Sequence, residues 1–389
     1  MRPVAPARRS GPRAVPRRRF TGWFLVLALL CGLGLSAPGA QATPTTNPAS
    51  VWWEAYPNLP LYPDNSTNPG KRVIDIGIHS PSTDNMTVKW VRVLLPKNWS
   101  KTANRTWPTL WMLHGGGGDH TSYTTDTHIE EMVADEDVMV VMPETSKCSS
   151  YTNWWNYDDE SQPPNWEDYV VDEVSQILES QYRASGERSV LGISMGGGGA
   201  MMLAGKHPGH FKAVASISGA VNMLHYDAEE AIQGPSVVKA GALQCGVDWK
   251  RINGEPGYPF YTNVQSDERE KQRWIDNSAL GVAEGLRGTP LFVSFGNGNT
   301  VDPGWVWNGA QTATPSPGRC QATAPPKGFD GVGSFVERAI RGQNHDFVNE
   351  LAARGIAATV CMTYGQHEWQ YWEREVYAAL PMLLDAIDA

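Results

Sequence analysis

Apolar runs and amphipathic stretches alternate along most of the chain. Residues 71–80 and 86–96 are rich in β-branched residues and predict two strands of an early hairpin. The runs "WPTLWMLHG" (107–115) and "DVMVVMPE" (137–144) are continuously apolar, which is typical of central strands covered on both faces. Residues 166–182 place apolar side chains at helical spacing.

The same alternation continues to the C-terminus. Further strands are predicted at 189–194, 211–218, 290–296 and 356–364, and further helices at 201–208, at 333–355 and beyond Trp369. Residues 220–288 form a long irregular stretch, which we interpret as a cap insertion. The pattern predicts a doubly wound, mostly parallel sheet with helices on both faces, and ligands in such sheets bind at the carboxyl ends of the strands.

The first 42 residues carry the features of a secretory signal. Seven Arg and no acid precede a short apolar run, and small residues follow up to Ala40-Gln41-Ala42. The run "RRRF" resembles a twin-arginine signal, so both Sec and twin-arginine export are open. We expect a protein secreted from a bacterium or associated with its cell wall, with an extended lead-in at 43–70 and one catalytic domain at 71–389.

Charge narrows the range of partners. The chain has 32 basic and 41 acidic residues, and removal of the signal leaves 25 basic against 41 acidic. Such an acidic protein is a poor nucleic-acid binder, and no basic amphipathic helix predicts binding to an anionic membrane. Beyond the signal, no stable membrane span is expected.

The cysteines of the mature chain are four in number: Cys148, Cys245, Cys320 and Cys361. In an extracellular protein an even count predicts one or two disulfides, and the pairing stays open. No closely spaced Cys/His cluster is present, so we expect neither a metal site nor a cofactor.

The segment "GISMG" (192–196) has the form G-x-S-x-G between a predicted strand and a predicted helix. This is the context of the nucleophile elbow of α/β-hydrolases, in which a tight turn lifts the serine above the sheet. An ordinary Gly/Ser turn is the alternative. We therefore predict an α/β-hydrolase fold with Ser194 as the nucleophile.

A serine nucleophile needs a base and an acid, which follow it along the chain in this fold. His367 follows the last predicted strand, whereas His345 lies within a helical pattern, so His367 is the favoured base. Two acids fit. Asp302 follows the strand at 290–296, and Glu337 lies thirty residues before His367; fold logic alone leans slightly towards Asp302.

The run "HGGGGD" (114–119) follows a predicted strand, where this fold supplies one donor of the oxyanion hole. The N–H groups of Gly116 and Met195 are the candidate donors, with Gly117 as a neighbour of the first. A phosphate-binding loop is the rival interpretation, but neither G-x-x-x-x-G-K-[ST] nor a dinucleotide-type G-x-G-x-x-G is present.

From about residue 70 to 388 the chain resembles the actinobacterial mycolyltransferases of the antigen 85 complex, within the esterase D-like branch of α/β-hydrolases. The likeness rests on "GISMGGGGAMMLAGKHPGHFKAVASISG", "YTNWW", "RWIDNSA", "LFVSFGNGN" and the H-x-W-x-x-W form of "GQHEWQYW". It implies that the acid is the Glu of the late helix, here Glu337, with Asp302 as the alternative. The family's trehalose-holding Asp-Gly-Leu and Arg are absent from the loop at 114–119, which leaves the acceptor open.

Together these features predict a secreted serine esterase or acyltransferase that acts through an acyl-serine on a lipid or acyl-sugar type of ester. The acceptor is water in a plain carboxylesterase, or a sugar or glycerol hydroxyl in a transferase. A non-catalytic protein that binds a wall or host component is the alternative of another class. Five residues are expected to line the substrate cleft: His114, Gly117, Trp154, Trp155 and Trp369.

Overall fold

The structure is a computed structural model that describes residues 48–56, 72–84, 87–159, 162–227, 232–255, 268–298 and 332–389. All of them belong to one compact unit, Ala42–Ala389. Asp302 and Cys320 lie outside the described residues. None of the described helices is both long and apolar enough to cross a bilayer.

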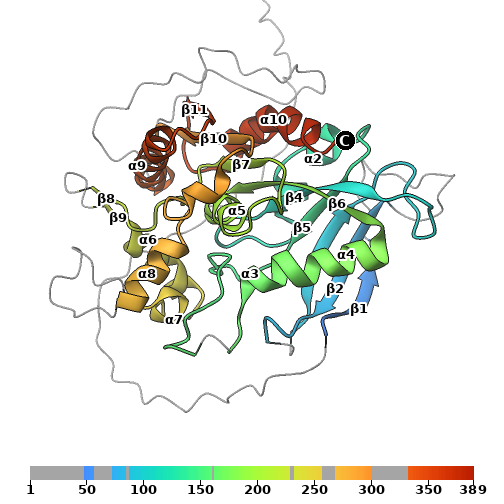
Figure 1. The fold of residues 1–389 in the computed structure, drawn as a ribbon, viewed down its shortest axis with the longest axis horizontal. Coiled ribbons are helices and arrows are strands. Elements are labelled where there is room, and N and C mark those ends of the chain that lie inside the picture. The colour runs from blue at the N-terminus through green and yellow to red at the C-terminus, as the bar shows by residue number, and fades with distance from the viewer. Residues whose placement is uncertain are drawn as a thin grey trace, which may run out of the picture. The chain divides into compact units, whose positions relative to one another are not determined.

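A nine-stranded sheet forms the centre of this unit (Figure 1), in the spatial order β1-β2-β3-β5-β4-β6-β7-β10-β11. The strands in chain order are β1 (Ser50–Ala55), β2 (Val73–His79), β3 (Lys89–Leu94), β4 (Trp107–Leu113), β5 (Met139–Pro143), β6 (Ala184–Ile193), β7 (Val214–Ile217), β10 (Leu291–Gly296) and β11 (Thr359–Thr363). From β5 to β11 all neighbours pair in parallel, whereas β1, β2 and β3 pair antiparallel at the other side. The predicted α/β-hydrolase fold with its mostly parallel sheet is confirmed.

Helices cover both faces of this sheet, because its central strands are buried apolar runs. On one face lie α3 (Trp166–Asp168), the π-helix η1 (Tyr169–Val174), α4 (Ser175–Tyr182), α5 (Met195–Lys206), the 3-10 helix η3 (Ala283–Leu286) and α9 (Val332–Ala353). On the other face lie α1 (Ser122–Asp126), α2 (Ile129–Met132) and α10 (Trp369–Asp385). The α10 helix seals its face with Trp372, Val376, Leu380 and Leu383, which recur at helical spacing.

Two segments carry more regular structure than their sequences predict. The stretch at 220–288, expected to be irregular, contains α6 (Gly234–Gln244), α7 (Lys250–Asn253), α8 (Glu268–Asp276) and the short hairpin of β8 (Tyr226–Asp227) with β9 (Ile232–Gln233). The lead-in predicted at 43–70 supplies the edge strand β1. In both segments tertiary packing stabilises elements whose own sequence signals are weak.

Candidate active site

The elbow forms where β6 ends and α5 begins. Ser194 stands between them with φ 52° and ψ −120°, a conformation rare for a residue with a side chain. Its N–H donates to the Ile217 carbonyl of β7 at 2.9 Å, and its own carbonyl accepts from the Ala220 N–H at 3.1 Å. These bonds hold the strained turn, so that the serine side chain lies at the carboxyl edge of the sheet.

Ser194 is joined to two other predicted site residues by hydrogen bonds. The Ser194 Oγ lies 2.8 Å from His367 Nε2, and His367 Nδ1 lies 2.7 Å from Glu337 Oε2. His367 follows β11, and its imidazole packs edge-on against Trp372 with ring centroids 4.7 Å apart. The structure therefore brings together the serine, the histidine and the late-helix glutamate.

The carboxylate of Glu337 is completely buried and is held on its other side as well. Its Oε1 accepts from Ser218 Oγ at 2.8 Å and from the Gly296 N–H at 2.5 Å. Both donors lie at the carboxyl ends of neighbouring strands, β7 and β10. Ser218 and Gly296 were not identified from the sequence as partners of the acid. Their positions at the ends of two predicted strands were the one signal that could have indicated them.

His345 is not part of this arrangement. It lies two turns further along α9, with its ring 5.3 Å from that of Phe295. Burial, together with the nearby Arg341, lowers the pKa of His345. Its environment favours the neutral form and provides no link to Ser194.

The loop after β4 presents backbone N–H groups next to the serine. The Gly117 N–H donates to the Lys147 carbonyl at 3.0 Å, and the Gly118 N–H donates to the Gly115 carbonyl at 3.1 Å. In the part of the chain that the structure describes, the Gly116 N–H makes no hydrogen bond. Met195 is the first residue of α5, so its N–H has no acceptor within the helix. Gly116 and Met195 thus offer two free donors, whereas the donor of Gly117 is occupied.

His114 lies beneath this loop rather than in a cleft. It is 1% exposed, its Nδ1 lies 2.8 Å from the Gly115 carbonyl, and its Nε2 accepts from the Thr145 N–H at 3.0 Å. Burial lowers the pKa of His114, which favours the neutral imidazole that this pattern requires. The expectation that His114 lines the substrate cleft is therefore corrected: it holds the loop in place.

Two cavities meet at Ser194, Gly116 and His367. The first, of about 130 Å³, is mainly apolar and has walls from α6 and α9 that include Val237, Val238 and Ile340. The second, of about 300 Å³, is more polar and is bounded by the glycine loop, Asp126, Trp369 and Trp372. Gly117 and Trp369, both predicted to line a cleft, lie in the wall of the second cavity.

Trp154 and Trp155 line neither cavity. They are 3% and 4% exposed, and the Trp154 indole N–H donates to the Ser149 carbonyl at 3.1 Å. Arginine side chains cover their rings: Arg251 lies over Trp154, and Arg273 over Trp155. The two tryptophans that were predicted to bind substrate are therefore buried outside both cavities at Ser194, because sequence does not tell which face of a loop becomes core.

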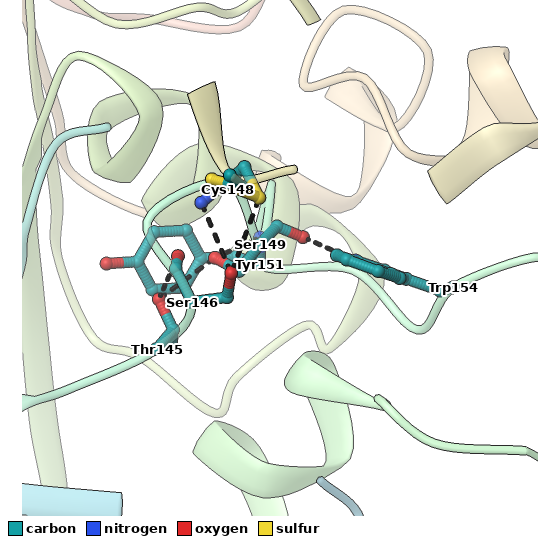
Figure 2. The surroundings of a disulfide bond; sticks show 7 residues. Thr145, Ser146, Cys148, Ser149, Tyr151 and Trp154 are labelled. Carbon is teal, nitrogen blue, oxygen red and sulfur yellow. Dashed lines mark hydrogen bonds between the residues drawn. A yellow bond between two sulfur atoms is a disulfide. The ribbon is translucent and has the colours of Figure 1, made fainter. Parts of the chain in front are cut away.

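A disulfide between Cys148 and Cys245 ties the loop after β5 to the end of α6. Figure 2 shows the surrounding loop, in which Thr145 Oγ1 lies 2.9 Å from Ser149 Oγ. Cys148 also forms part of the apolar cavity wall. In the chain-entropy description, closing a loop of 97 residues stabilises the fold by about 4–5 kcal/mol. The bond between Cys148 and Cys245 is one of the pairings that the sequence left open. Cys361 is disulfide-bonded too.

Comparisons with known proteins agree with this geometry. A family model described as "Putative esterase" matches residues 83–306, which include Ser194 but end before Glu337 and His367. Esterase Rv1288 of Mycobacterium tuberculosis (strain H37Rv) is 31% identical over 177 residues, which are 42% of this chain. The chain spans only 38% of the length of that relative.

Solved structures share the fold at low identity. An S-formylglutathione hydrolase from Agrobacterium tumefaciens superposes with a TM-score of 0.56 at 16% identity, covering 81% of this chain and 96% of that one. MPT51 of Mycobacterium tuberculosis superposes with a TM-score of 0.55 at 19% identity, covering 79% and 96%. Because the family match covers more than half of the chain and includes the elbow, the protein belongs to this esterase family of α/β-hydrolases.

Proposed function

We propose that the protein is a serine esterase that forms an acyl-enzyme on Ser194. His367 Nε2 takes the proton of Ser194 Oγ as the oxygen attacks the ester carbonyl carbon. The N–H groups of Gly116 and Met195 donate to the oxyanion of the tetrahedral intermediate. Glu337 keeps the imidazole oriented and stabilises its protonated form.

The intermediate collapses as His367 gives its proton to the departing alkoxide, which leaves as the alcohol. Water then occupies the alcohol's position, loses a proton to His367 and attacks the acyl carbonyl carbon. The same donors stabilise the second oxyanion, and the proton returns to Ser194 Oγ as the acid is released. The proton transfers use His367, which already lies within hydrogen-bond distance of both Ser194 and Glu337.

The observation that carries this proposal is the unbroken hydrogen-bonded series from Ser194 through His367 to Glu337, located where two cavities meet. The apolar cavity suits the acyl group, and the more polar cavity suits the alcohol. A cavity of about 130 Å³ is close in size to an engineered protein cavity that binds benzene. We therefore expect short acyl groups, of about the length of a butyryl chain, to be preferred over long ones.

Acyl transfer to an alcohol is the second candidate function. The second cavity, at about 300 Å³, has room for an alcohol acceptor beside Ser194 and is bounded by Trp369 and Asp126. An acceptor bound there would compete with water only if it were held in attack geometry. Incubation with an acyl donor plus trehalose, glycerol or water, followed by product identification, separates the two functions. A transferase yields the acylated alcohol, and an esterase yields only the free acid.

We also propose that the protein is exported, with residues 1–42 as its signal. The Cys148–Cys245 disulfide supports this location, because such bonds persist in oxidising compartments. N-terminal sequencing of the protein recovered from the culture medium or cell wall tests it. A chain that begins near residue 43 is expected; full-length protein retained inside the cell would contradict export.

Hydrolysis of p-nitrophenyl butyrate tests the catalytic assignment. The Ser194→Ala variant is expected to lose about 10⁴-fold or more in kcat, as removal of a nucleophile does in serine hydrolases. The Glu337→Gln variant is expected to lose about 10³-fold or more, whereas the matched Asp302→Asn variant should retain wild-type turnover. Equal activity of Ser194→Ala and wild type would overturn the mechanism, and an inactive wild type would favour the non-catalytic binding protein.

A further inference from the structure

The tryptophans divide sharply by location. Thirteen of the sixteen tryptophans lie in the described residues, and nine of those thirteen are buried. Solvent reaches the other four: Trp52, Trp53, Trp90 and Trp369. Trp369 borders the second cavity, while Trp52 and Trp53 are 59% and 57% exposed. Large aromatic rings left this exposed on a soluble protein mark binding surfaces more often than chance.

Strand register places these side chains at the edge of the sheet that carries Ser194. Trp53 pairs with Gly77 of β2, and Gly77 pairs with Trp90 of β3. The next residue of β3, Val91, pairs with Pro143, the last residue of β5. Trp52, Trp53 and Trp90 therefore lie level with the carboxyl ends of the parallel strands, where ligands of this fold bind.

A bulge puts two consecutive tryptophans on one face. Successive residues of a regular strand point to opposite faces, but the pairing of β1 with β2 shifts between Val51 and Trp53. The rings of Trp52 and Trp53 consequently lie 6.3 Å apart, and Trp52 also lies 5.5 Å from the ring of His79. The ring of Trp90 covers Gly77 on this same face, since a Cβ at Gly77 would lie 3.3 Å from it.

The row continues towards the second cavity. Trp90 stacks on His120, with centroids 6.1 Å apart and planes inclined by 23°, and His120 precedes α1, whose last residue, Asp126, borders that cavity. Five interstrand steps separate β1 from β6, which corresponds to about 24 Å at the usual strand spacing. We call Trp52, Trp53, His79, Trp90 and His120 the aromatic row.

Charges near the aromatic row are paired or acidic. Arg92 is neutralised by a bidentate pair with Asp75, both bonds being 2.8 Å. Glu144 accepts from the Trp90 N–H at 3.2 Å, and Asp126 stands at the far end. Such a surface offers flat ring faces and hydrogen-bond acceptors while repelling polyanions.

From this arrangement we infer that the aromatic row binds a neutral polysaccharide chain and presents its ester substituents to Ser194. The C–H faces of sugar rings stack on aromatic side chains, and sugar hydroxyls donate to carboxylates. The span of about 24 Å from β1 to β6, the strand that leads into Ser194, fits a chain of several sugar units rather than a small molecule. The inference rests on the proposed esterase function, but the binding it requires is measurable without catalysis.

Affinity electrophoresis of the Ser194→Ala chain tests this binding, since that variant cannot consume the ligand. Gels contain xylan, galactomannan or hydroxyethylcellulose, with polygalacturonate as the anionic comparison. Retardation by at least one neutral polysaccharide is expected, and adding Trp52→Ala and Trp53→Ala should weaken it about tenfold or more. A Trp52→Phe/Trp53→Phe pair, which keeps both rings, should retain most of the retardation.

The matched control is Tyr157→Ala, which removes an aromatic side chain that is 58% exposed on a loop outside β1 and should leave retardation unchanged. In the chain with an intact Ser194, the Trp52→Ala/Trp53→Ala pair should hydrolyse p-nitrophenyl butyrate at the wild-type rate but show a raised KM on an acetylated polysaccharide. Absence of retardation by every neutral polysaccharide, equal retardation of the double alanine variant, or retardation only by polygalacturonate would overturn the inference. If the wild type hydrolysed neither ester, the proposed esterase function would be overturned instead.

Discussion

The glycine run after β4 and the glycine run at the start of α5 lie on either side of the same serine but in opposite surroundings. In the first run, a Cβ at Gly116 would meet only the Lys147 carbonyl oxygen, at 3.6 Å, and one at Gly117 would meet nothing within 4 Å. In the second run, a Cβ at Gly196 would overlap the Leu113 carbonyl, and one at Gly198 would overlap the Ala220 carbonyl.

The difference separates two uses of a residue without a side chain. The middle of the first run, Gly116 and Gly117, is open, so its value lies in the backbone N–H of Gly116 and in the positive φ of Gly117. The second run is closed, because α5 packs directly against the main chain of β4 and of the segment after β7. Substitutions should therefore affect catalysis in the first run and folding in the second.

Among substitutions in the two glycine runs, Gly116→Pro gives the largest expected effect. Proline at this position removes the N–H donor, and loss of one oxyanion donor typically costs about 10²–10³ in kcat. Gly116→Ala is the matched control, since it keeps the donor and its Cβ has room. Steady-state kinetics on p-nitrophenyl butyrate, with thermal unfolding to check the fold, measures the pair. Equal kcat values for the two folded variants would contradict the claim that the first run acts through the Gly116 N–H.

Gly198→Ala should act on stability instead. Overlap with the Ala220 carbonyl forces α5 away from its neighbours, which costs about 2–3 kcal/mol after the better helix propensity of alanine is included. Urea denaturation measures the change. The folded fraction should keep a kcat near that of the wild type. A variant as stable as the wild type would show that the close packing is not required.

His114→Phe tests what holds the first run in place. The phenyl ring keeps the volume but leaves the Thr145 N–H without its acceptor and the Gly115 carbonyl without the imidazole, at a cost of about 1–3 kcal/mol in unfolding free energy. His114→Gln, whose amide oxygen can still accept from Thr145, should lose less. Equal unfolding free energies of His114→Phe and His114→Gln would argue against this role of the histidine.

Acid should weaken the fold through two histidines, His114 beneath the first run and His210 beyond the C-terminal end of α5. Burial lowers the pKa of His114, and burial with Arg188 and His207 lowers the pKa of His210, which follows α5, to about 4. The unfolded chain takes up protons below about pH 6.5 while the folded chain does not, so stability falls as the pH drops from 6.5 towards 4. His210→Phe should flatten this dependence of the unfolding midpoint, and an unchanged slope would exclude His210 as a contributor.

Local signals in the sequence predicted the fold and part of the site. The order strand, G-x-S-x-G, helix indicated Ser194, and the strand before His367 indicated the base, because both residues depend on their own neighbours in the chain. The acid was different. Fold logic leaned towards Asp302, and only the family resemblance favoured Glu337, since its approach to His367 depends on how α9 packs against β10.

Burial was the hardest property to predict. Trp154 and Trp155 were expected in a cleft but lie in the core, whereas Trp52 and Trp53 lie on an edge strand within a segment expected to be only a lead-in. The composition of a segment does not reveal which of its faces another segment will cover. The walls that α6 and Cys148 give to the apolar cavity are set by long-range contacts of the same kind.

The acyl-enzyme itself is the most direct measure of the mechanism. Wild-type protein mixed with p-nitrophenyl butyrate, quenched in acid within the first turnover and digested, should show one butyryl group on the peptide that contains Ser194. The matched Ser194→Ala sample should show none and should release no burst of p-nitrophenol. Turnover of the ester with Ser194 unmodified, or acylation at another residue, would contradict the account.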